Sequence, residues 1–192
     1  MADYVTLAQV KTALGLAEND LIDDEAIELA IDAAEDSIEE YCGRRFTQVA
    51  DARRFTVERG RVEIDDVATM VGFSVAVDAD GDGVHERALD ATDYRTLPLN
   101  APANGRPITE LENLVVAPRG AGAVQVTATF GWPAVPAQIR QAAMFKALRL
   151  LTRGPFRTAG AGEPGEAART PSDDDITKLL KPFRKRPPVV VA

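Results

Sequence analysis

The chain has 192 residues, of which 45% are hydrophobic and 27% charged, as in a soluble globular protein with one main domain. Its formal net charge of −8 argues against general nucleic-acid binding, for which a basic surface supplies most of the affinity. No apolar run predicts a membrane span, the N-terminus lacks the pattern of a signal peptide, and a single cysteine, Cys42, excludes an internal disulfide.

Charge is distributed unevenly along the chain. Residues 1–43 carry one basic and twelve acidic side chains, whereas residues 136–192 carry eleven basic and five acidic ones. The two segments therefore have net charges of −11 and +6. They could neutralise each other within one subunit or between neighbouring subunits.

Two helices are predicted at the N-terminal end. The first covers residues 6–14, with Thr6 as the N-cap and Gly15 as the stop signal. The second covers residues 23–42 and contains no Lys or Arg, so its charge either stays in solvent or is met by basic groups from elsewhere. Carboxylates at helical spacing form an acidic stripe on this helix: Glu28, Asp32, Glu35 and Glu39.

A β region is predicted over residues 52–130. Alternation of apolar and polar side chains predicts strands around 55–57, 62–64, 73–77, 114–117 and 124–130, with turn-forming residues between them. Several short strands joined by tight turns favour antiparallel pairing.

A third helix is predicted over residues 136–153, because Pro136 suits a first helical turn. Three basic residues form a stripe beside its apolar face: Lys146, Arg149 and Arg153. Residues 154–172 are rich in Gly, Ala and Pro and predict a flexible loop. Residues 173–192 predict a short helix and an extended C-terminal tail. The fold class is therefore α+β, with a small bundle of about four helices, an inserted antiparallel β region and an extended C-terminal arm.

One acidic turn resembles half of a calcium site. Residues 78–83, DADGDG, match the first half of an EF-hand loop, in which Asp78, Asp80 and Asp82 would supply oxygen ligands. The twelfth loop position is Leu89 instead of a bidentate Glu, and the flanking segments predict strands. A hairpin turn is the simpler interpretation, and a calcium-binding module is the alternative.

No pattern predicts an active site. Gly160, Gly162 and Gly165 spell GxGxxG, but no predicted strand precedes them, so dinucleotide binding is not indicated. His85 is the only histidine, and no motif places a nucleophile beside it. Cys42 is expected to pack on the last turn of the second helix. We therefore expect no cofactor and no enzymatic activity.

The C-terminal tail is basic. Arg184, Lys185 and Arg186 follow Phe183 and predict docking on an acidic surface of a neighbouring subunit or of a partner. The alternatives are a solvated tail and contact with phosphate, but three charges give only weak affinity for nucleic acid.

The order of these features resembles that of the head–tail connector (head-to-tail adaptor) proteins of long-tailed phages. The resemblance begins with VTLAQVKTALGL and DDEAIELAIDAAEDSIEEYCGRRF and ends with FGWPAVPAQIRQAAMFKALRLLTRG. Between them, VDADGDGVHERALDATDYRTLPLNAPANGRPITEL is similar to the β insertion of such proteins from phages of actinobacteria. Together the similarity covers about residues 5–153, so residues 1–153 would form the connector domain.

The resemblance implies a structural protein of the virion neck, assembled in the host cytoplasm. Such a protein forms a ring, commonly of twelve copies, that docks below the portal, continues the DNA channel and joins head to tail. The implied partners are further copies of the chain, the portal protein, which a C-terminal segment would engage, and a neck or tail protein. Genome DNA would pass through without sequence-specific binding. Another neck or tail-completion protein is the alternative.

A ring gives the two charged stripes a role. Each subunit of a closed ring contacts its neighbours through two different flanks. The acidic stripe of the second helix and the basic stripe of the third helix are suitable opposite flanks. Alternatively, the acidic stripe lines the channel and repels DNA phosphates. The same carboxylates cannot do both, and the sequence leaves the two placements open.

Overall fold

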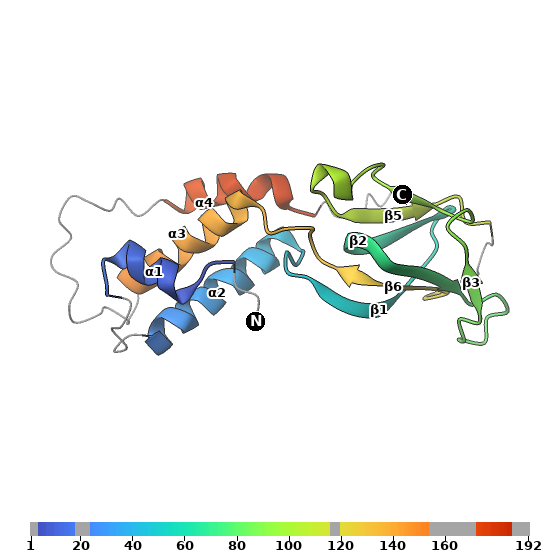
Figure 1. Cartoon of the computed structure of the whole chain (residues 1–192), viewed down its shortest axis with the longest axis horizontal. Coiled ribbons are helices and arrows are strands. Elements are labelled where there is room, and N and C mark those ends of the chain that lie inside the picture. The colour runs from blue at the N-terminus through green and yellow to red at the C-terminus, as the bar shows by residue number, and fades with distance from the viewer. Residues whose placement is uncertain (1–3, 18–23, 116–119, 154–171, 186–192) are drawn as a thin grey trace, which may run out of the picture. The chain divides into compact units, whose positions relative to one another are not determined.

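The computed structural model describes residues 4–17, 24–115, 120–153 and 172–185. The chain divides into two compact units, each described by itself below. The helical unit comprises residues 1–44 and 135–192, and the β unit comprises residues 45–134 (Figure 1). Four α-helices and an antiparallel sheet lie within the described residues, which confirms the predicted α+β class.

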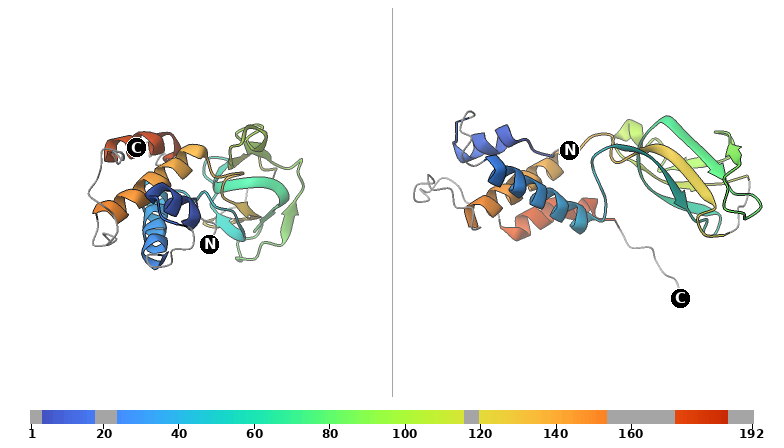
Figure 2. Two further views of the ribbon diagram at one scale, coloured as in Figure 1. Left: turned by 60° about the vertical axis from the view of Figure 1, so that its left-hand side comes forward. Right: turned by 90° about the horizontal axis from the view of Figure 1, so that it is seen from below.

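The helical unit contains α1 (Leu7–Leu14), α2 (Asp24–Cys42), α3 (Ala137–Arg153) and α4 (Asp173–Leu180), followed by a short 3-10 turn, η2 (Lys181–Phe183). Figure 2 shows these helices from two further directions. Residues 154–171 and the tail from residue 186 lie outside the described residues, so the expected loop, its glycines and the extended arm are not described.

Local signals fix the ends of the short helices. Thr6 and Gln9 form a reciprocal capping box at the start of α1, and Gly15, with φ of 74°, ends the helix. Ser172 and Asp175 form the same arrangement at the start of α4. Each box satisfies backbone N–H groups that the first helical turn leaves unpaired.

The core of the helical unit lies between its two long helices. α2 packs along α3, and α4 packs against α3. Fully buried side chains at helical spacing meet there: Ile27, Ala34 and Ile38 from α2, and Ile139, Ala143 and Ala147 from α3. No helix among the described residues combines the length and the apolar character that crossing a membrane requires.

The β unit is a six-stranded antiparallel sheet. Its strands are β1 (Val49–Phe55), β2 (Arg61–Val77), β3 (Arg87–Leu89), β4 (Arg95–Leu97), β5 (Ile108–Glu112) and β6 (Val124–Phe130). The order is β1-β6-β2-β5-β4, and β3 pairs with β2. A 3-10 turn, η1 (Pro102–Asn104), precedes β5.

The longest strand corrects one prediction. The segments 62–64 and 73–77, predicted as two strands, belong to the single 17-residue strand β2. Its register against β6 shifts between Thr69 and Ser74, where Gly72 has φ of 71°. This bulge lets the strand bend without ending, so that its first part pairs with β5 and its last part with β3.

The strand predicted at 114–117 is also wrong. Leu114 and Val115 lie outside any strand, and residues 116–117 are not described. The strand is β5 instead, which ends just before Asn113. Because Asn113 has φ of 56°, the backbone leaves the extended conformation there.

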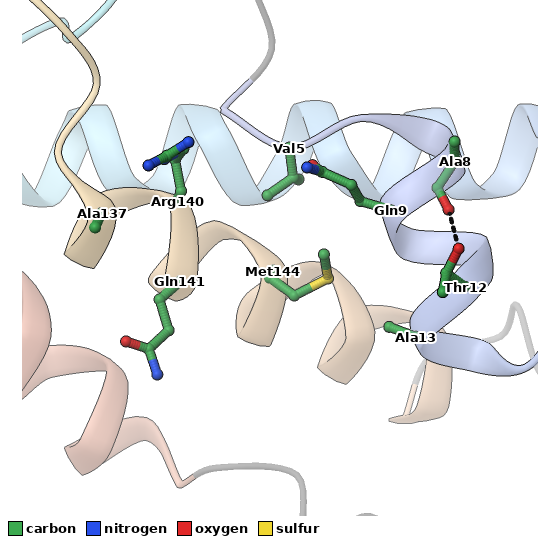
Figure 3. A pocket seen from close by; sticks show the side chains of 9 residues that line it. All are labelled: Val5, Ala8, Gln9, Thr12, Ala13, Ala137, Arg140, Gln141 and Met144. Atoms are coloured by element: carbon green, nitrogen blue, oxygen red, sulfur yellow. Dashed lines mark hydrogen bonds between the residues drawn. The ribbon is translucent and has the colours of Figure 1, made fainter.

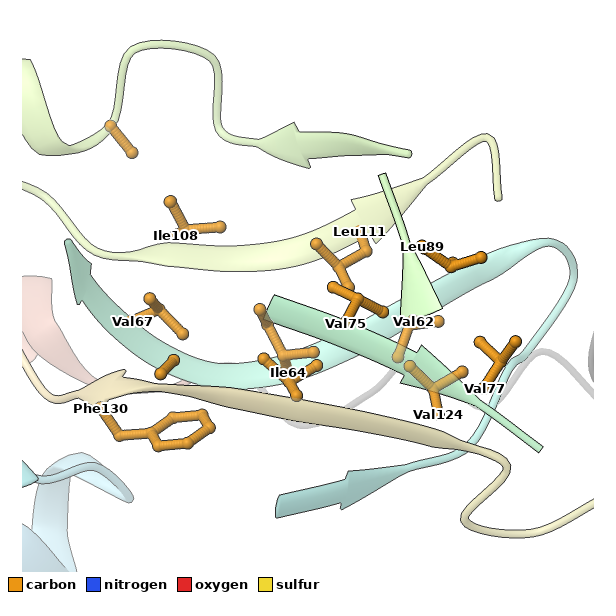
Figure 4. Packing of buried hydrophobic residues seen from close by; sticks show 13 residues of the cluster. Val62, Ile64, Val67, Val75, Val77, Leu89, Ile108, Leu111, Val124 and Phe130 are labelled. Atoms are coloured by element: carbon orange, nitrogen blue, oxygen red, sulfur yellow. The ribbon is translucent and has the colours of Figure 1, made fainter. Parts of the chain in front are cut away.

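The core of the β unit lies against the curved sheet (Figure 4). β2, β5 and β6 supply most of its buried side chains, including Val62, Ile64, Val67, Ile108, Leu111, Val124, Val126 and Phe130. These branched apolar residues suit a pleated surface, and their burial stabilises the sheet.

The segments that enter and leave the β unit lie side by side. The Phe46 and Trp132 rings are 5.4 Å apart, and Gln48 Nε2 donates hydrogen bonds to the carbonyl oxygens of Trp132 and Pro133. Trp132 Nε1 also donates to the buried carboxylate of Asp66, at 2.9 Å.

Gly131 makes the closest approach between these two segments. A Cβ at this position would lie 2.2 Å from the Thr47 carbonyl oxygen, and the glycine has φ of 119°. Only glycine fits here, since any side chain would collide with the backbone and strain its own conformation.

Candidate assembly surfaces

The solvent-facing side of α2 carries a continuous band of carboxylates, called here the acidic face. It consists of Glu25, Glu28, Asp32, Asp36 and Glu40, at intervals of three or four residues. In the part of the chain that the structure describes, none of these five makes an ion pair or side-chain hydrogen bond. Leu29 lies among them and is 53% exposed, although it is a large apolar residue. The acidic face is therefore both charged and partly apolar.

The predicted acidic stripe is divided by the N-terminal segment. Glu35 accepts a hydrogen bond from the backbone N–H of Tyr4, and Glu39 accepts one from the Tyr4 hydroxyl at 2.6 Å. Glu28 and Asp32 belong to the acidic face. Tyr4, which is only 2% exposed, thus forms hydrogen bonds with two of the four carboxylates that were predicted to face a neighbouring subunit or the DNA channel.

The basic stripe of α3 has partners inside the helical unit. Lys146 Nζ donates a hydrogen bond to Ser37 Oγ on α2, and Arg149 forms an ion pair with Asp173 at the start of α4. These contacts fasten α3 to both helices beside it. The side chain of Arg153 is outside the described residues. A contact of this stripe with a neighbouring copy stays a prediction.

The start of the basic tail lies along the end of α2. The Lys185 backbone N–H donates to the Cys42 carbonyl oxygen at 2.7 Å, and the Arg184 guanidinium lies 5.7 Å from the Tyr41 ring centroid. Cationic side chains are favourable at this end of a helix, where the dipole is negative. Phe183 is half-buried beside them, and Arg186 lies outside the described residues. Docking of this tail on a partner stays a prediction.

Cys42 itself is fully buried beneath this segment. Burial raises the pKa of its thiol to about 11, although Arg44 acts in the opposite direction. A thiol with this pKa is protonated near neutral pH and is a poor nucleophile.

The helical unit also has a groove that the sequence did not predict. It lies between α1 and α3 and has a volume of about 630 Å³ (Figure 3). Its lining is mostly small or apolar, with a few polar groups: Val5, Ala8, Gln9, Thr12 and Ala13 on one side, and Ala137, Arg140, Gln141 and Met144 on the other. No sequence motif marks it, because it arises from the crossing of two helices far apart in the chain.

In the structure, a fourth carboxylate joins the three aspartates of the acidic turn. Carboxylate oxygens of Asp78, Asp80, Asp82 and Glu86 lie within 4.8 Å of one another. Glu86 occupies the ninth position of the calcium-loop pattern and was missed at the sequence level. Such a cluster satisfies the geometry of a cation site, but it is also common in exposed acidic turns without one.

Hydrogen bonds within this turn favour the hairpin interpretation. The Asp78 carboxylate accepts from the backbone N–H groups of Gly81 and Gly83, at 2.6 and 2.8 Å. Burial acts to raise the pKa of Asp78, but these hydrogen bonds and the charge of His85 bring it below its ordinary value. His85 Nε2 lies 2.9 Å from the Gly122 carbonyl oxygen, to which it donates, so the histidine joins two loops.

Comparison with known families places the first part of the chain. Residues 4–71, which span α1, α2, β1 and most of β2, match the family described as phage gp6-like head-tail connector protein. This part of the chain is similar to that family. The resemblance to the head–tail connector family seen in the sequence is thereby confirmed for residues 4–71. Comparison with curated proteins gives no significant match.

Solved structures share the fold over almost the whole chain. A chain from the neck of an empty GTA particle, computed with C6 symmetry, has a TM-score of 0.60 at 19% identity, with 98% of this chain and 93% of that chain covered. A chain from the virion of a native gene transfer agent particle has a TM-score of 0.58 at 22% identity, with the same coverage. A third, from the neck of the native particle computed with C12 symmetry, has a TM-score of 0.55 at 21% identity, covering 96% and 91%. The chain therefore shares the fold of these particle proteins over almost its whole length.

Proposed function

We propose that this chain is a structural head-to-tail adaptor in the neck of a phage or phage-like virion. One combined observation carries the proposal: the connector-family match over residues 4–71 lies within a fold shared, over nearly the whole chain, with proteins of virion necks. Its place is the assembled virion, and it joins the virion after synthesis in the host.

The functional form in this proposal is a ring of twelve copies. The C6 and C12 symmetries of the similar neck structures support a ring, since each symmetry relates copies around one axis. The ring would bind the portal above and a neck or tail protein below. Genome DNA would pass through its channel, and the net charge of −8 would oppose adhesion of the phosphates.

The proposed role is mechanical, without catalysis. The matched proteins are structural parts of particles. Cys42 and His85, the side chains most suited to nucleophilic or acid–base chemistry, both have structural roles in the fold. Cys42 is buried, with a thiol pKa of about 11, and the His85 ring is bonded to the Gly122 carbonyl.

The decisive experiment mixes the purified chain with the portal protein of the same phage. Negative-stain micrographs should show rings stacked coaxially on the portal, and mass photometry should show the matching increase in mass. A chain that stays monomeric beside the portal would overturn the proposal. Parallel pull-downs with portal and tail-tube protein separate it from the tail-completion alternative, because only an adaptor should retain the portal.

Calcium binding is a second candidate, favoured by the clustering of Glu86 with the three aspartates. Titration calorimetry with calcium should then give a binding heat that the Asp80→Asn variant lacks. An unchanged melting temperature and no heat in the wild type would eliminate it. The adaptor proposal does not depend on this outcome.

A further inference from the structure

Two surfaces of the helical unit are complementary in shape and charge. The acidic face of α2 carries five carboxylates without partners among the described residues, and an exposed leucine, Leu29, lies in their midst. The groove between α1 and α3 is concave and is lined largely by small side chains. The acidic face protrudes and is negatively charged, whereas the groove is concave and carries the cation Arg140.

The groove fits a helix. Three alanines line the groove: Ala8, Ala13 and Ala137. Because their side chains are short, the backbone of a docked helix can approach closely. Met144 adds a flexible apolar side chain that can adapt its shape to the docked helix. Arg140 is exposed at its edge, and no ion pair is found for it within the described residues. A negatively charged helix with a central apolar side chain is the occupant that these features favour.

The two surfaces lie on different sides of the helical unit. α2 packs on α1 and α3 through the side that carries Ile27, Ala34 and Ile38, so the acidic face points away from both helices. In Figure 3, which looks at the groove, α2 runs behind the two helices that form it. A protein therefore cannot fill its own groove with its own acidic face, whereas a second copy can.

We infer that, in the assembled ring, the acidic face of α2 from one copy docks in the α1/α3 groove of the next copy. Leu29 then packs against the small side chains of the groove, and Arg140 lies among the carboxylates. The contact is heterologous, because each of the two copies contributes a different surface. Such contacts form a closed ring when a whole number of the rotations between neighbouring subunits adds up to a full turn. The inference rests on the proposed ring and assigns its interface.

This assignment places the acidic face between subunits and not along the DNA channel. It also explains why Leu29 is exposed in the isolated chain. An exposed apolar side chain surrounded by charges is typical of an interface anchor with a polar rim. The cations predicted from the sequence, Lys146 and Arg149, are held by α2 and α4 of their own copy, which leaves Arg140 as the cation of this interface.

Cross-linking in the full chain tests the contact. Leu29→Cys and Met144→Cys are combined in one chain, and a short bis-maleimide is added to rings assembled on the portal. Native Cys42 does not interfere, because it is fully buried with a thiol pKa of about 11. We expect a ladder of covalent multimers on a denaturing gel, since each copy is joined to the next.

A matched pair provides the control. Leu150 is also on α3 and is 36% exposed, but it lies six residues beyond Met144 and hence on another side of the helix. The Leu29→Cys/Leu150→Cys chain and the Leu29→Cys single variant should give no ladder. Rings with no ladder, or with equal ladders for both pairs, would overturn this interface and leave the adaptor proposal standing. Cross-links from Met144→Cys to the portal would assign the groove to the portal instead.

Charge reversal gives an independent readout that does not need a cross-link. Arg140→Glu, and separately Glu28→Lys with Asp32→Lys, should weaken association between copies on the order of fivefold. A chain with all three changes should recover, because the reversed charges again oppose each other. Recovery supports the contact, whereas additive losses overturn it. If the wild-type chain forms no ring at all, the proposed function fails and this inference fails with it.

Discussion

Replacing Gly131 by alanine should disrupt the junction where the chain enters and leaves the β unit. At this residue φ is 119°, which strains an L-amino acid, at a cost of about 1–3 kcal/mol. The new methyl group would also lie 2.2 Å from the Thr47 carbonyl oxygen. Real contacts are not that short, so the two segments must separate, and overpacking of this kind costs about 1–3 kcal/mol.

The two effects together destabilise the β unit by about 2–6 kcal/mol. A typical domain has a free energy of unfolding of only about 5–15 kcal/mol, so the loss is a large fraction of the total. The variant should remain folded at low temperature but should unfold at a much lower urea concentration.

Trp132 makes the assay specific. It is the only tryptophan in the chain and follows Gly131 directly, so its fluorescence in a urea titration reports on this junction. Circular dichroism on the same samples reports on both units. We expect the fluorescence midpoint to shift strongly, because the ring loses its position 5.4 Å from Phe46 when the two segments separate.

Gly72→Ala is the matched control. Its φ of 71° is also positive, but no atom lies within 4 Å of an added Cβ, so only the backbone strain applies, at about 1 kcal/mol. If Gly131→Ala were no more destabilising than Gly72→Ala, the close approach to Thr47 would not exist, and the reasoning about the paired segments would be refuted.

Three further outcomes are expected. Cys42 should react with a thiol reagent at pH 8 only on unfolding, since burial raises its pKa to about 11; rapid modification of the native protein would contradict its burial. The pKa of Asp175 is lowered by its hydrogen bonds with Ser172, so this group stabilises the folded state above about pH 4, and the stabilisation is lost as pH falls through the lowered pKa. Melting curves should therefore show Asp175→Asn less stable than the wild type at pH 7, with a deficit that shrinks steadily as the pH falls below about 4; a deficit that does not change with pH would refute this assignment. Tyr4→Phe removes the hydroxyl that donates to Glu39, which should cost about 1.5–3 kcal/mol in urea unfolding of the helical unit, and no measurable loss would mean that the bond is not formed in solution.

The helices were predictable because their signals are local. The Thr6 cap and the Gly15 stop delimit α1, and both act through backbone groups within one turn. The apolar period of α2 likewise identifies its buried side, since Ile27, Ile31 and Ile38 are all buried. Such features depend on neighbours in sequence, which a single chain displays directly.

The sheet was predicted less well because its strands depend on distant partners. β5 has little alternation, with Ile108 and Leu111 buried three residues apart, so the pattern pointed to the apolar residues beyond Asn113 instead. β3 and β4 have three residues each, too few for a period to register.

The candidate surfaces were only partly predictable, for the same reason. The sequence found Glu28 and Asp32 but could not know that Tyr4 would fold back onto Glu35 and Glu39, more than thirty residues away. The α1/α3 groove likewise depends on residues far apart in the chain, whereas Glu86 stands at the ninth position of the loop pattern and could have been found from the sequence.

The pairing of Thr47 with Gly131 has a consequence for how this protein can vary. A segment whose first and last residues touch can be lengthened, shortened or exchanged without altering the path of the chain on either side. Residues 45–134 should therefore behave as a transplantable module: expressed alone they should fold, and a tight turn in their place should leave the remaining helices able to assemble. A different β unit could then replace this one while the helical unit stays unchanged.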